Sequence, residues 1–205
     1  MQYLSIVSQE MQRLKILISS MLNLTKFDNG TIEIHYQLFP IQDLAFRTIL
    51  MFESRLEKRN ITLEGLDSEP VQVWGDPDLI GQVIYNLFEN ATKFVNTGGT
   101  ITFTFKDEPN STSIAIRNTG AGISKEELPK IFERFYKSDD SRSHDKTGLG
   151  IGLDITKHIV RLHKAQISVS SEEGEYTEFL IRLPKKDAPA ESPTENPEKQ
   201  PKDAR

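Results

Sequence analysis

The 205-residue sequence contains no cysteine. This absence excludes disulfide bonds, thiolate nucleophiles and cysteine-type zinc sites, and it is compatible with a reducing cytosol. No apolar run approaches the roughly 18 residues that a membrane-spanning helix needs, so we predict no membrane segment in this chain. A basic excess is also missing, because 25 Lys and Arg stand against 30 Asp and Glu and give a formal charge of −5. We therefore expect no nucleic-acid partner.

The length fits one domain of ordinary size with extensions at its ends. The last segment, residues 185–205, is rich in proline and charge and has almost no apolar side chains. Such a composition cannot bury enough surface to offset the entropy of ordering the chain. We expect residues 185–205 to be a disordered tail.

Residues 3–28 predict one long helix. Further leucines widen its apolar face beyond a two-stranded seam, so burial in a helical bundle is favoured over a plain zipper. The segment Asp28-Asn29-Gly30 would end this helix. The apolar residues that recur at alternating spacings of three and four, as in a coiled coil, are Leu4, Val7, Met11, Leu14, Ile18 and Met21.

Helices and strands alternate in the predicted domain between residues 31 and 184. Hairpin-like strand pairs favour an α+β fold, a two-layer α/β sandwich in which helices cover one face of a mixed, mostly antiparallel sheet. The other face must then be polar or shielded. Asp76-Pro77 is typical of an N-cap followed by proline, and Ser124 with Glu127 resembles a capping box at a helix start. The predicted strands cover residues 31–37, 61–66, 71–74, 100–105, 113–117, 166–170 and 177–183, and the predicted helices cover about 40–56, 76–95 and 151–163.

Asn86, Asn90 and Lys93 form a polar stripe on the predicted helix at 76–95. They stand at relative positions 0, +4 and +7, roughly 100° around the helix from its apolar centre. Amide oxygens suit Mg²⁺ and an ammonium suits phosphate, so the stripe could line a metal-bound phosphate chain. Taken alone, it is better explained as the solvated side of an amphipathic helix. The apolar arc of that helix is predicted to be Ile80, Val83, Ile84, Leu87, Ala91 and Phe94.

Two glycine-bearing loops follow apolar segments. Residues 118–123 read Asn-Thr-Gly-Ala-Gly-Ile after a predicted strand, and residues 148–153 read Gly-Leu-Gly-Ile-Gly-Leu at the start of a predicted helix. Glycine lets the backbone approach a ligand closely, and the N–H groups of a helix N-terminus attract anions. Alone, the first loop is better explained as a simple turn, and the second leaves phosphate binding and a structural turn equally open.

The joint pattern resembles the histidine-kinase branch of the ATPase superfamily that includes gyrase, the Hsp90 chaperones and MutL. Its four sequence boxes correspond to residues 78–95 (N box), 118–123 (G1 box), 131–136 (F box, Ile-Phe-Glu-Arg-Phe-Tyr) and 148–153 (G2 box). The resemblance covers about residues 1–183. It implies the Bergerat-type ATP-binding fold, with ATP and Mg²⁺ as cofactors.

The resemblance also implies roles for single residues. Asn90 would be the principal Mg²⁺ ligand with Asn86 beside it, Lys93 would contact phosphate, and Phe94 would pack near the adenine. Asn118 stands where most members carry an aspartate that accepts a hydrogen bond from the adenine amino group. An amide oxygen can still accept that bond, but without the charge-assisted part, at a cost of about 1 kcal/mol.

The remaining implied nucleotide-binding residues lie in the glycine loops, in the F box and in residues 137–147, which would form a lid over ATP. Glycine N–H groups would face the phosphates, and Arg142 would contact phosphate from the lid. The set comprises Gly120, Gly122, Ile123, Tyr136, Arg142, Thr147, Gly148, Leu149, Gly150, Gly152 and Leu153.

The domain organisation follows from the same resemblance. Residues 1–30 resemble the second helix of the dimerisation and phosphoacceptor hairpin, and residues 31–184 the catalytic domain. No stretch like His-Glu-Leu-Arg-Thr-Pro, which carries the phosphoacceptor histidine in such kinases, is present. We expect the chain to be a fragment of a membrane sensor kinase, a shortened natural product being the alternative. We interpret the four histidines as structural or solvated, none with the acidic neighbour and helical setting of an acceptor: His35, His144, His158 and His163.

The leading hypothesis is therefore the catalytic part of a protein histidine kinase, the cytoplasmic portion of a membrane-anchored sensor. It would transfer the γ-phosphoryl group of ATP to a histidine outside this chain, pair through the helix at 3–28 as a homodimer, and serve a response regulator. The alternative is a non-catalytic, nucleotide-binding or dimerising regulatory module. A hydrolytic ATPase is disfavoured, because Asn86 stands where such an enzyme needs a glutamate base.

Overall fold

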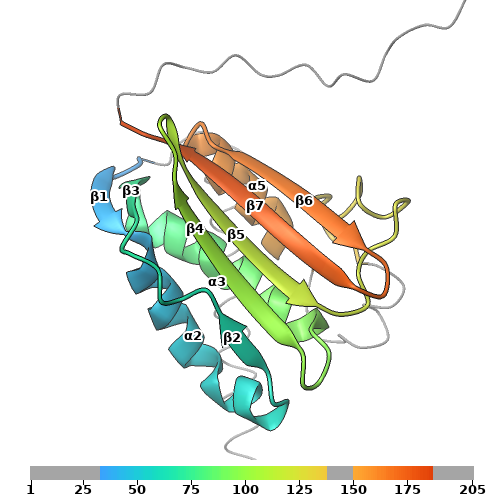
Figure 1. Ribbon diagram of the computed structural model, residues 1–205. Helices are drawn as coiled ribbons and strands as arrows, with labels where there is room; N and C mark the ends of the chain where they lie inside the picture. The colour runs from blue at the N-terminus through green and yellow to red at the C-terminus, as the bar shows by residue number, and fades with distance from the viewer. Residues whose placement is uncertain (1–32, 138–149, 187–205) are drawn as a thin grey trace, which may run out of the picture.

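The computed structural model describes residues 33–137 and 150–186 (Figure 1). The predicted helix at 3–28, residues 187–205 of the tail predicted at 185–205, and most of the predicted lid lie outside the described residues, so these remain predictions. So do the assignments of Arg142, Thr147, Gly148 and Leu149. The first tail residue, Lys185, is described, and its N–H donates to the carbonyl of Asn110 at 3.0 Å. Across the described ranges, no helix has both the length and the apolar character needed to cross a membrane.

The centre of the domain is a five-stranded mixed sheet. Its order is β2-β4-β5-β7-β6; β2 pairs parallel with β4, and the other three pairs are antiparallel. The strands are β2 (Thr62–Glu64), β4 (Thr100–Asp107), β5 (Ser111–Thr119), β6 (Gln166–Glu172) and β7 (Tyr176–Pro184). The mixed, mostly antiparallel sheet expected from the sequence is confirmed. A separate two-stranded sheet joins β1 (Gln37–Pro40) to β3 (Gln72–Gly75) antiparallel.

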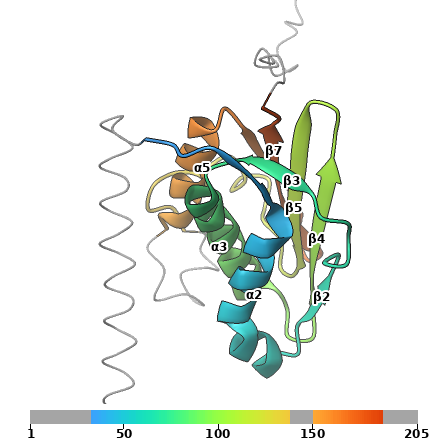
Figure 2. The ribbon, with the colours of Figure 1, turned by 90° about the vertical axis from the view of Figure 1, so that its left-hand side faces the viewer.

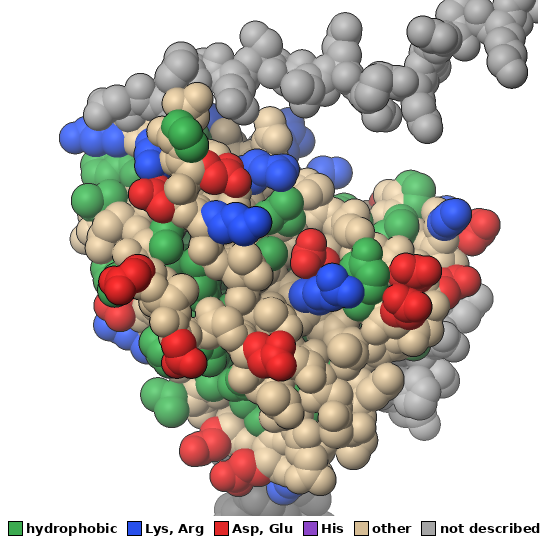
Figure 3. All heavy atoms as spheres, viewed as in Figure 1, with side chains coloured by type: hydrophobic (Ala, Val, Ile, Leu, Met, Phe, Trp, Pro, Cys, Tyr) green, Lys and Arg blue, Asp and Glu red, His purple; other side chains and the backbone are tan. Residues whose placement is uncertain are grey.

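Three helices cover one face of this sheet (Figure 2): α2 (Ile41–Lys58), α3 (Pro77–Phe94) and α5 (Gly152–Leu162). Alternation along the strands explains the layering, because Ile101, Phe103 and Phe105 of β4 all point to the same, helix-covered side and are buried. The opposite face carries polar residues with scattered charges of both signs (Figure 3). The α+β, two-layer prediction is thus confirmed.

Two predicted elements differ from the structure. The first strand was predicted at residues 31–37, but β1 begins at residue 37, because residues 37–40 are the ones that pair with β3. The capping-box segment at Ser124 does not begin a helix. Glu127 and Leu128 donate backbone hydrogen bonds to the Ser124 carbonyl, but the chain continues in turns. Pro129 has no N–H to extend a helix, and its ring would clash with the carbonyl four residues before it.

The apolar arc of α3 is correct except at its end. Phe94 is 39% exposed and does not belong to the core, whereas Phe88, which the predicted arc omitted, is fully buried. Val95 takes the inward position after Ala91 and is 1% exposed. The core-facing side therefore runs through residues 84, 88, 91 and 95, which is the spacing of one helical face.

Candidate functional site

Asn86 joins α3 to the start of α5. Its Nδ2 donates to the carbonyl oxygen of Gly152 at 3.0 Å and to the hydroxyl of Thr156 at 3.3 Å. A carbonyl can only accept, so the amide must turn its NH₂ group toward α5. The Oδ1 atom of Asn86 is then left as an acceptor, as a cation ligand must be.

Asn90 follows one turn later on the same side of α3. It is half-buried, and among the described residues its side chain has no hydrogen-bond partner. Within those residues, no group of three or more His, Cys, Asp or Glu could hold a metal ion. A cation here would therefore depend on the two amide oxygens, on water and on ligand oxygens, which is the manner in which Mg²⁺ binds with nucleotide phosphates.

The N-terminus of α5 faces this stripe. Its N-cap residue is Ile151, and no side chain there bonds to the first N–H groups. Those N–H groups and the positive end of the helix dipole favour an anion. Gly150 just before it has a φ of +71°, and a Cβ at that position would lie 2.6 Å from the carbonyl oxygen of Tyr136. Only glycine fits both constraints.

The G1 loop at residues 118–123 is held between α3 and β6. Val95 forms an isolated antiparallel bridge with Gly120, and a Cβ on Gly120 would lie 2.2 Å from the carbonyl oxygen of Phe94. Gly122 has a φ of +72° and abuts the backbone of Glu172. The glycines thus serve close backbone packing, and they fix the loop against the C-terminal end of the helix that carries the stripe.

Asn118 is buried at the end of β5, with 4% of its surface exposed. Its Nδ2 donates to the carbonyl oxygen of Thr119 at 3.0 Å. This bond again fixes the amide orientation and leaves Oδ1 as the acceptor. An aspartate could not make the same bond, because an ionised carboxylate has no N–H or O–H to donate.

The described residues that flank the predicted lid are hydrogen-bonded to each other. The N–H of Phe135 donates to the carbonyl of Gly150 at 3.1 Å, and Phe135 itself has a φ of +62°. Beside this contact, Nε of Arg134 binds Oδ2 of Asp154 at 2.7 Å. The Tyr136 hydroxyl donates to Glu127 at 3.3 Å. A backbone hydrogen bond therefore joins the F box to the G2 box, and an ion pair joins it to the residue that directly follows the G2 box.

Arg134 and Asp154 were missed by the sequence analysis. Two sequence features could have indicated them: Arg134 is a positive charge within the largely apolar F box, and Asp154 is an acidic residue in the first turn of a predicted helix. His158 lies on α5, where its Nδ1 is 2.9 Å from the carbonyl oxygen of Asp154 and 3.3 Å from Oδ1 of the same residue. These contacts are compatible with the structural role expected for this histidine.

The structure brings most of the remaining predicted residues close to these elements. Lys93 is half-buried with Nζ 5.8 Å from the Phe94 ring centroid, and the N–H of Ile123 donates to Ser171 at 2.8 Å. Leu153 packs against the core. The stripe and the start of α5 are joined by hydrogen bonds, and the G1 loop adjoins the other end of α3.

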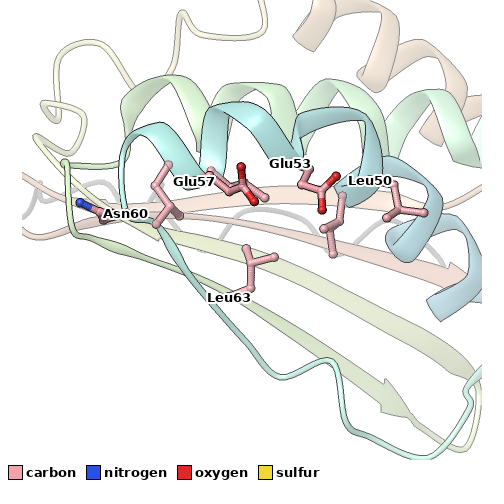
Figure 4. Close-up of a pocket in the computed structure, with 8 residues that line it drawn as sticks. Leu50, Glu53, Glu57, Asn60 and Leu63 are labelled. Atoms are coloured by element: carbon pink, nitrogen blue, oxygen red, sulfur yellow. The ribbon is translucent and has the colours of Figure 1, made fainter.

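A separate hollow of about 350 Å³ lies between α2 and β2 and shares no residue with the predicted site (Figure 4). Glu53 and Glu57 stand at its rim, and carboxylates there would repel phosphates. This hollow is not a nucleotide site. Its lining comprises Ile49, Leu50, Glu53, Leu56, Glu57, Asn60, Ile61 and Leu63.

Comparison with protein families gives a match to the histidine kinase-, DNA gyrase B- and HSP90-like ATPases over residues 75–187. The chain belongs to this ATPase family. Sensor protein SrrB of Staphylococcus aureus is 33% identical over 183 residues, which cover 89% of this chain and 31% of SrrB. The chain thus spans about a third of the length of the curated relatives that it matches.

Solved kinase structures share the fold. The catalytic domain of histidine kinase ThkA is 27% identical with a TM-score of 0.62, covering 73% of this chain and 97% of that domain. Acinetobacter baumannii histidine kinase AdeS has a TM-score of 0.73 at 22% identity, covering 90% of this chain and 84% of AdeS. Together with the family match and the similarity to SrrB, the ThkA match identifies residues 75–187 as an ATP-binding catalytic domain of the histidine-kinase type; AdeS supports the fold.

Proposed function

We propose that this domain binds ATP with Mg²⁺ between the polar stripe of α3 and the N-terminus of α5, and donates the γ-phosphoryl group to a histidine on a dimerisation hairpin. The observation that carries the proposal is the hydrogen bond from Asn86 to Gly152. It joins the N box and the G2 box, two segments that are 66 residues apart in the chain. Taken alone, the N box could be the solvated side of a helix and the G2 box a structural turn, so neither by itself indicates a phosphate site.

The residues present fit a magnesium ion. The Oδ1 atoms of Asn86 and Asn90 would hold it, and both are oxygen acceptors on one side of α3. When bound, Mg²⁺ neutralises phosphate charge. Lys93, one turn beyond Asn90, would add a point charge toward the phosphates, and the first N–H groups of α5 would bind phosphate oxygens.

The adenine would lie at the other end of the site. Asn118, buried at the end of β5, would accept the adenine amino hydrogen bond through Oδ1, next to Gly120 and Gly122. In the transfer, the bond between the γ-phosphorus and its bridging oxygen breaks as the bond to the histidine nitrogen forms, and ADP leaves. The protein contributes mainly positioning and charge stabilisation to such a reaction.

The partners follow from the same function. The acceptor histidine would lie on a hairpin whose second helix is residues 3–28, and this helix would form the homodimer. An aspartate of a response regulator would receive the phosphoryl group; histidine kinase ThkA has been crystallised in complex with the response regulator protein TrrA. We place the domain in the cytoplasmic portion of a membrane-anchored kinase.

A non-catalytic regulatory module is the second candidate. Asn118 favours it, because the amide at that position lacks the charge that strengthens a hydrogen bond from adenine. This candidate predicts nucleotide binding without transfer, or no binding.

Transfer to a separately supplied acceptor distinguishes the two. The chain would first be titrated with ATP in the presence of Mg²⁺. It would then be incubated with γ-labelled ATP and a hairpin that bears the acceptor histidine of a relative such as SrrB. Acid-labile label on the hairpin supports the kinase, whereas binding without label, repeated with several hairpins, supports the module.

Asn90→Ala is the matched variant for this experiment. Loss of the amide oxygen should abolish Mg²⁺-dependent nucleotide binding while leaving the fold intact, because Asn90 has no hydrogen-bond partner among the described residues. Isothermal titration with and without Mg²⁺ measures the effect. Unchanged affinity in the folded variant would mean that the metal site has been assigned to the wrong side chain.

A further inference from the structure

Arg59, just beyond the C-terminus of α2, reaches across to the C-terminus of α3. Its Nη1 donates to the carbonyl oxygens of Thr92 at 2.7 Å and Lys93 at 3.4 Å, and its Nη2 donates to that of Val95. The backbone carbonyl of Arg59 accepts from Gly98, so both ends of the residue are fixed. One guanidinium therefore serves three carbonyls at the end of a helix that belongs to the nucleotide site.

Those carbonyls are the groups that a helix cannot satisfy by itself. The last four C=O groups of an α-helix have no partner inside it, and together they form the negative end of the helix dipole. A guanidinium is planar, permanently charged and carries several N–H donors in a rigid fork. It can bind several carbonyls at once and add a favourable charge interaction.

The segment held by Arg59 is also the surface on which the G1 loop rests. Val95 forms a β-bridge with Gly120. The carbonyl oxygen of Phe94 lies so close to Gly120 that a Cβ added there would be only 2.2 Å from it. Lys93 and Phe94, both assigned to the nucleotide site, lie within the same segment. Movement of residues 93–95 would therefore displace the phosphate contact and the adenine loop together.

We propose that Arg59 is a positioning residue for nucleotide binding. It holds the C-terminal end of α3 so that Lys93 and the G1 loop keep the spacing that ATP requires, without touching the nucleotide. This inference rests on the proposed function, because it assumes that ATP binds at that site.

Arg55 supplies the matched control. It extends from the last turn of α2 and reaches the same turn of α3. Among the described residues, its guanidinium donates to the hydroxyl of Thr92 at 3.3 Å and to none of the three carbonyls. Its guanidinium also lies 5.5 Å from the Phe52 ring centroid. Arg55→Gln therefore removes a comparable cation at the α2–α3 contact without releasing the end of α3.

The test compares Arg59→Gln, Arg59→Lys and Arg55→Gln. Thermal unfolding gives the folded fraction, titration with Mg²⁺-ATP gives the Kd of that fraction, and amide hydrogen exchange reports on Val95 and Gly120. We expect ATP affinity to fall about tenfold in Arg59→Gln, with faster exchange at both amides. Arg59→Lys, which keeps the charge but loses the fork, should lose about threefold, and Arg55→Gln less than twofold.

A purely stabilising residue would lower the melting temperature and leave the Kd of the folded fraction unchanged. A Kd within twofold of the parent chain in folded Arg59→Gln, with unchanged exchange at Gly120, overturns the proposal. If Arg59→Gln does not fold, the same criteria applied to Arg59→Lys decide. Failure of the parent chain to bind ATP would instead refute the proposed function, and exchange at Gly120 would still show whether Arg59 holds the loop.

Discussion

The N-termini of α3 and α5 lie in the same helical layer but are built in opposite ways. At α3, the buried carboxylate of Asp76 accepts from the N–H groups of Asp78 and Leu79 at 3.0 and 3.1 Å, and from that of His35 at 2.9 Å. At α5, the N-cap is Ile151, and no side chain of residues 33–137 or 150–186 caps the helix. The first N–H groups of α3 are thus bonded by a side chain of the protein, whereas those of α5 have no such cap among the described residues.

Both helices are amphipathic, but the N-terminus of α3 would contribute mainly to stability and that of α5 mainly to nucleotide binding. A capped, buried N-terminus contributes to the free energy of folding. An uncapped N-terminus behind a glycine loop gives up that contribution and gains an anion site. The comparison predicts that substitutions at the α3 end change stability alone, and that those at the α5 end change nucleotide affinity with little effect on stability.

The largest effect is expected from Asp76→Ala. It removes a helix cap and leaves three N–H donors without an acceptor, so the free energy of unfolding should fall by about 2 to 3 kcal/mol. Urea denaturation measures this change. At temperatures where the variant is folded, its affinity for Mg²⁺-ATP should equal that of the parent chain; a marked loss would show that the capped end also belongs to the nucleotide site.

Gly152→Ala tests the open end. A Cβ at this position would lie 3.7 Å from Cγ of Asn86, an ordinary contact, and alanine favours the helix over glycine. Stability should stay equal or rise slightly, while a methyl group in the space assigned to phosphate lowers ATP affinity about tenfold, or about 1.4 kcal/mol. Titration and thermal unfolding of the same sample measure both. Full affinity would contradict the assignment of α5 to phosphate.

A smaller effect should appear in the pH dependence of the capped end. Nε2 of His163 accepts from the N–H of Asp76 at 3.1 Å, and its Nδ1 bonds to the carbonyl of Ile159 at 2.8 Å. The ring is thus held in its neutral form, and burial lowers the pKa of His163 despite the opposing influence of the Ile159 carbonyl and of Asp76.

Because the unfolded chain binds a proton on His163 below about pH 6.5 that the folded chain resists, the free energy of unfolding should be fully retained above that pH and decrease below it. Urea denaturation from pH 8 to pH 5 follows this change. In His163→Gln the part of the slope due to this residue should vanish. An identical slope in both chains would assign the pH dependence to other groups.

The smallest effect is expected from Asn118→Asp. A carboxylate restores the charge-assisted bond to the adenine amino group, but it loses the hydrogen bond to Thr119 and faces that carbonyl in a buried position. We expect a net gain in ATP affinity of a few fold, below about 1 kcal/mol, and a small loss of stability. Weaker binding of ATP by the aspartate variant would argue against the adenine role.

Local sequence signals predicted the elements that depend on local physics. Asp76-Pro77 specified the start of α3 correctly, because a cap acts on the next two or three N–H groups. Alternation in β4 placed its apolar side chains on the buried face. The same kind of signal failed at Ser124, where Pro129 prevented a helix, and at Phe94, where the core ends with Val95.

The candidate site was predicted as a set of separate boxes. Taken separately, the polar stripe was better explained as solvated helix and the first glycine loop as a turn, while the second loop left phosphate binding and a turn equally open. Only their joint resemblance to a family changed that interpretation. The contacts that unite them, from Asn86 to Gly152, Arg134 to Asp154 and Arg59 to the end of α3, join residues 20 to 66 positions apart. No local pattern specifies such pairs.

Composition and periodicity thus determined that this chain forms helices over one face of a sheet, because burial of alternating and helical apolar faces depends on residue type and spacing alone. The tertiary structure decided which helix ends are closed and which are open, and which side chains turn an acceptor toward the site. Those properties arise from partners brought together by packing, so they exist only once the layers have assembled.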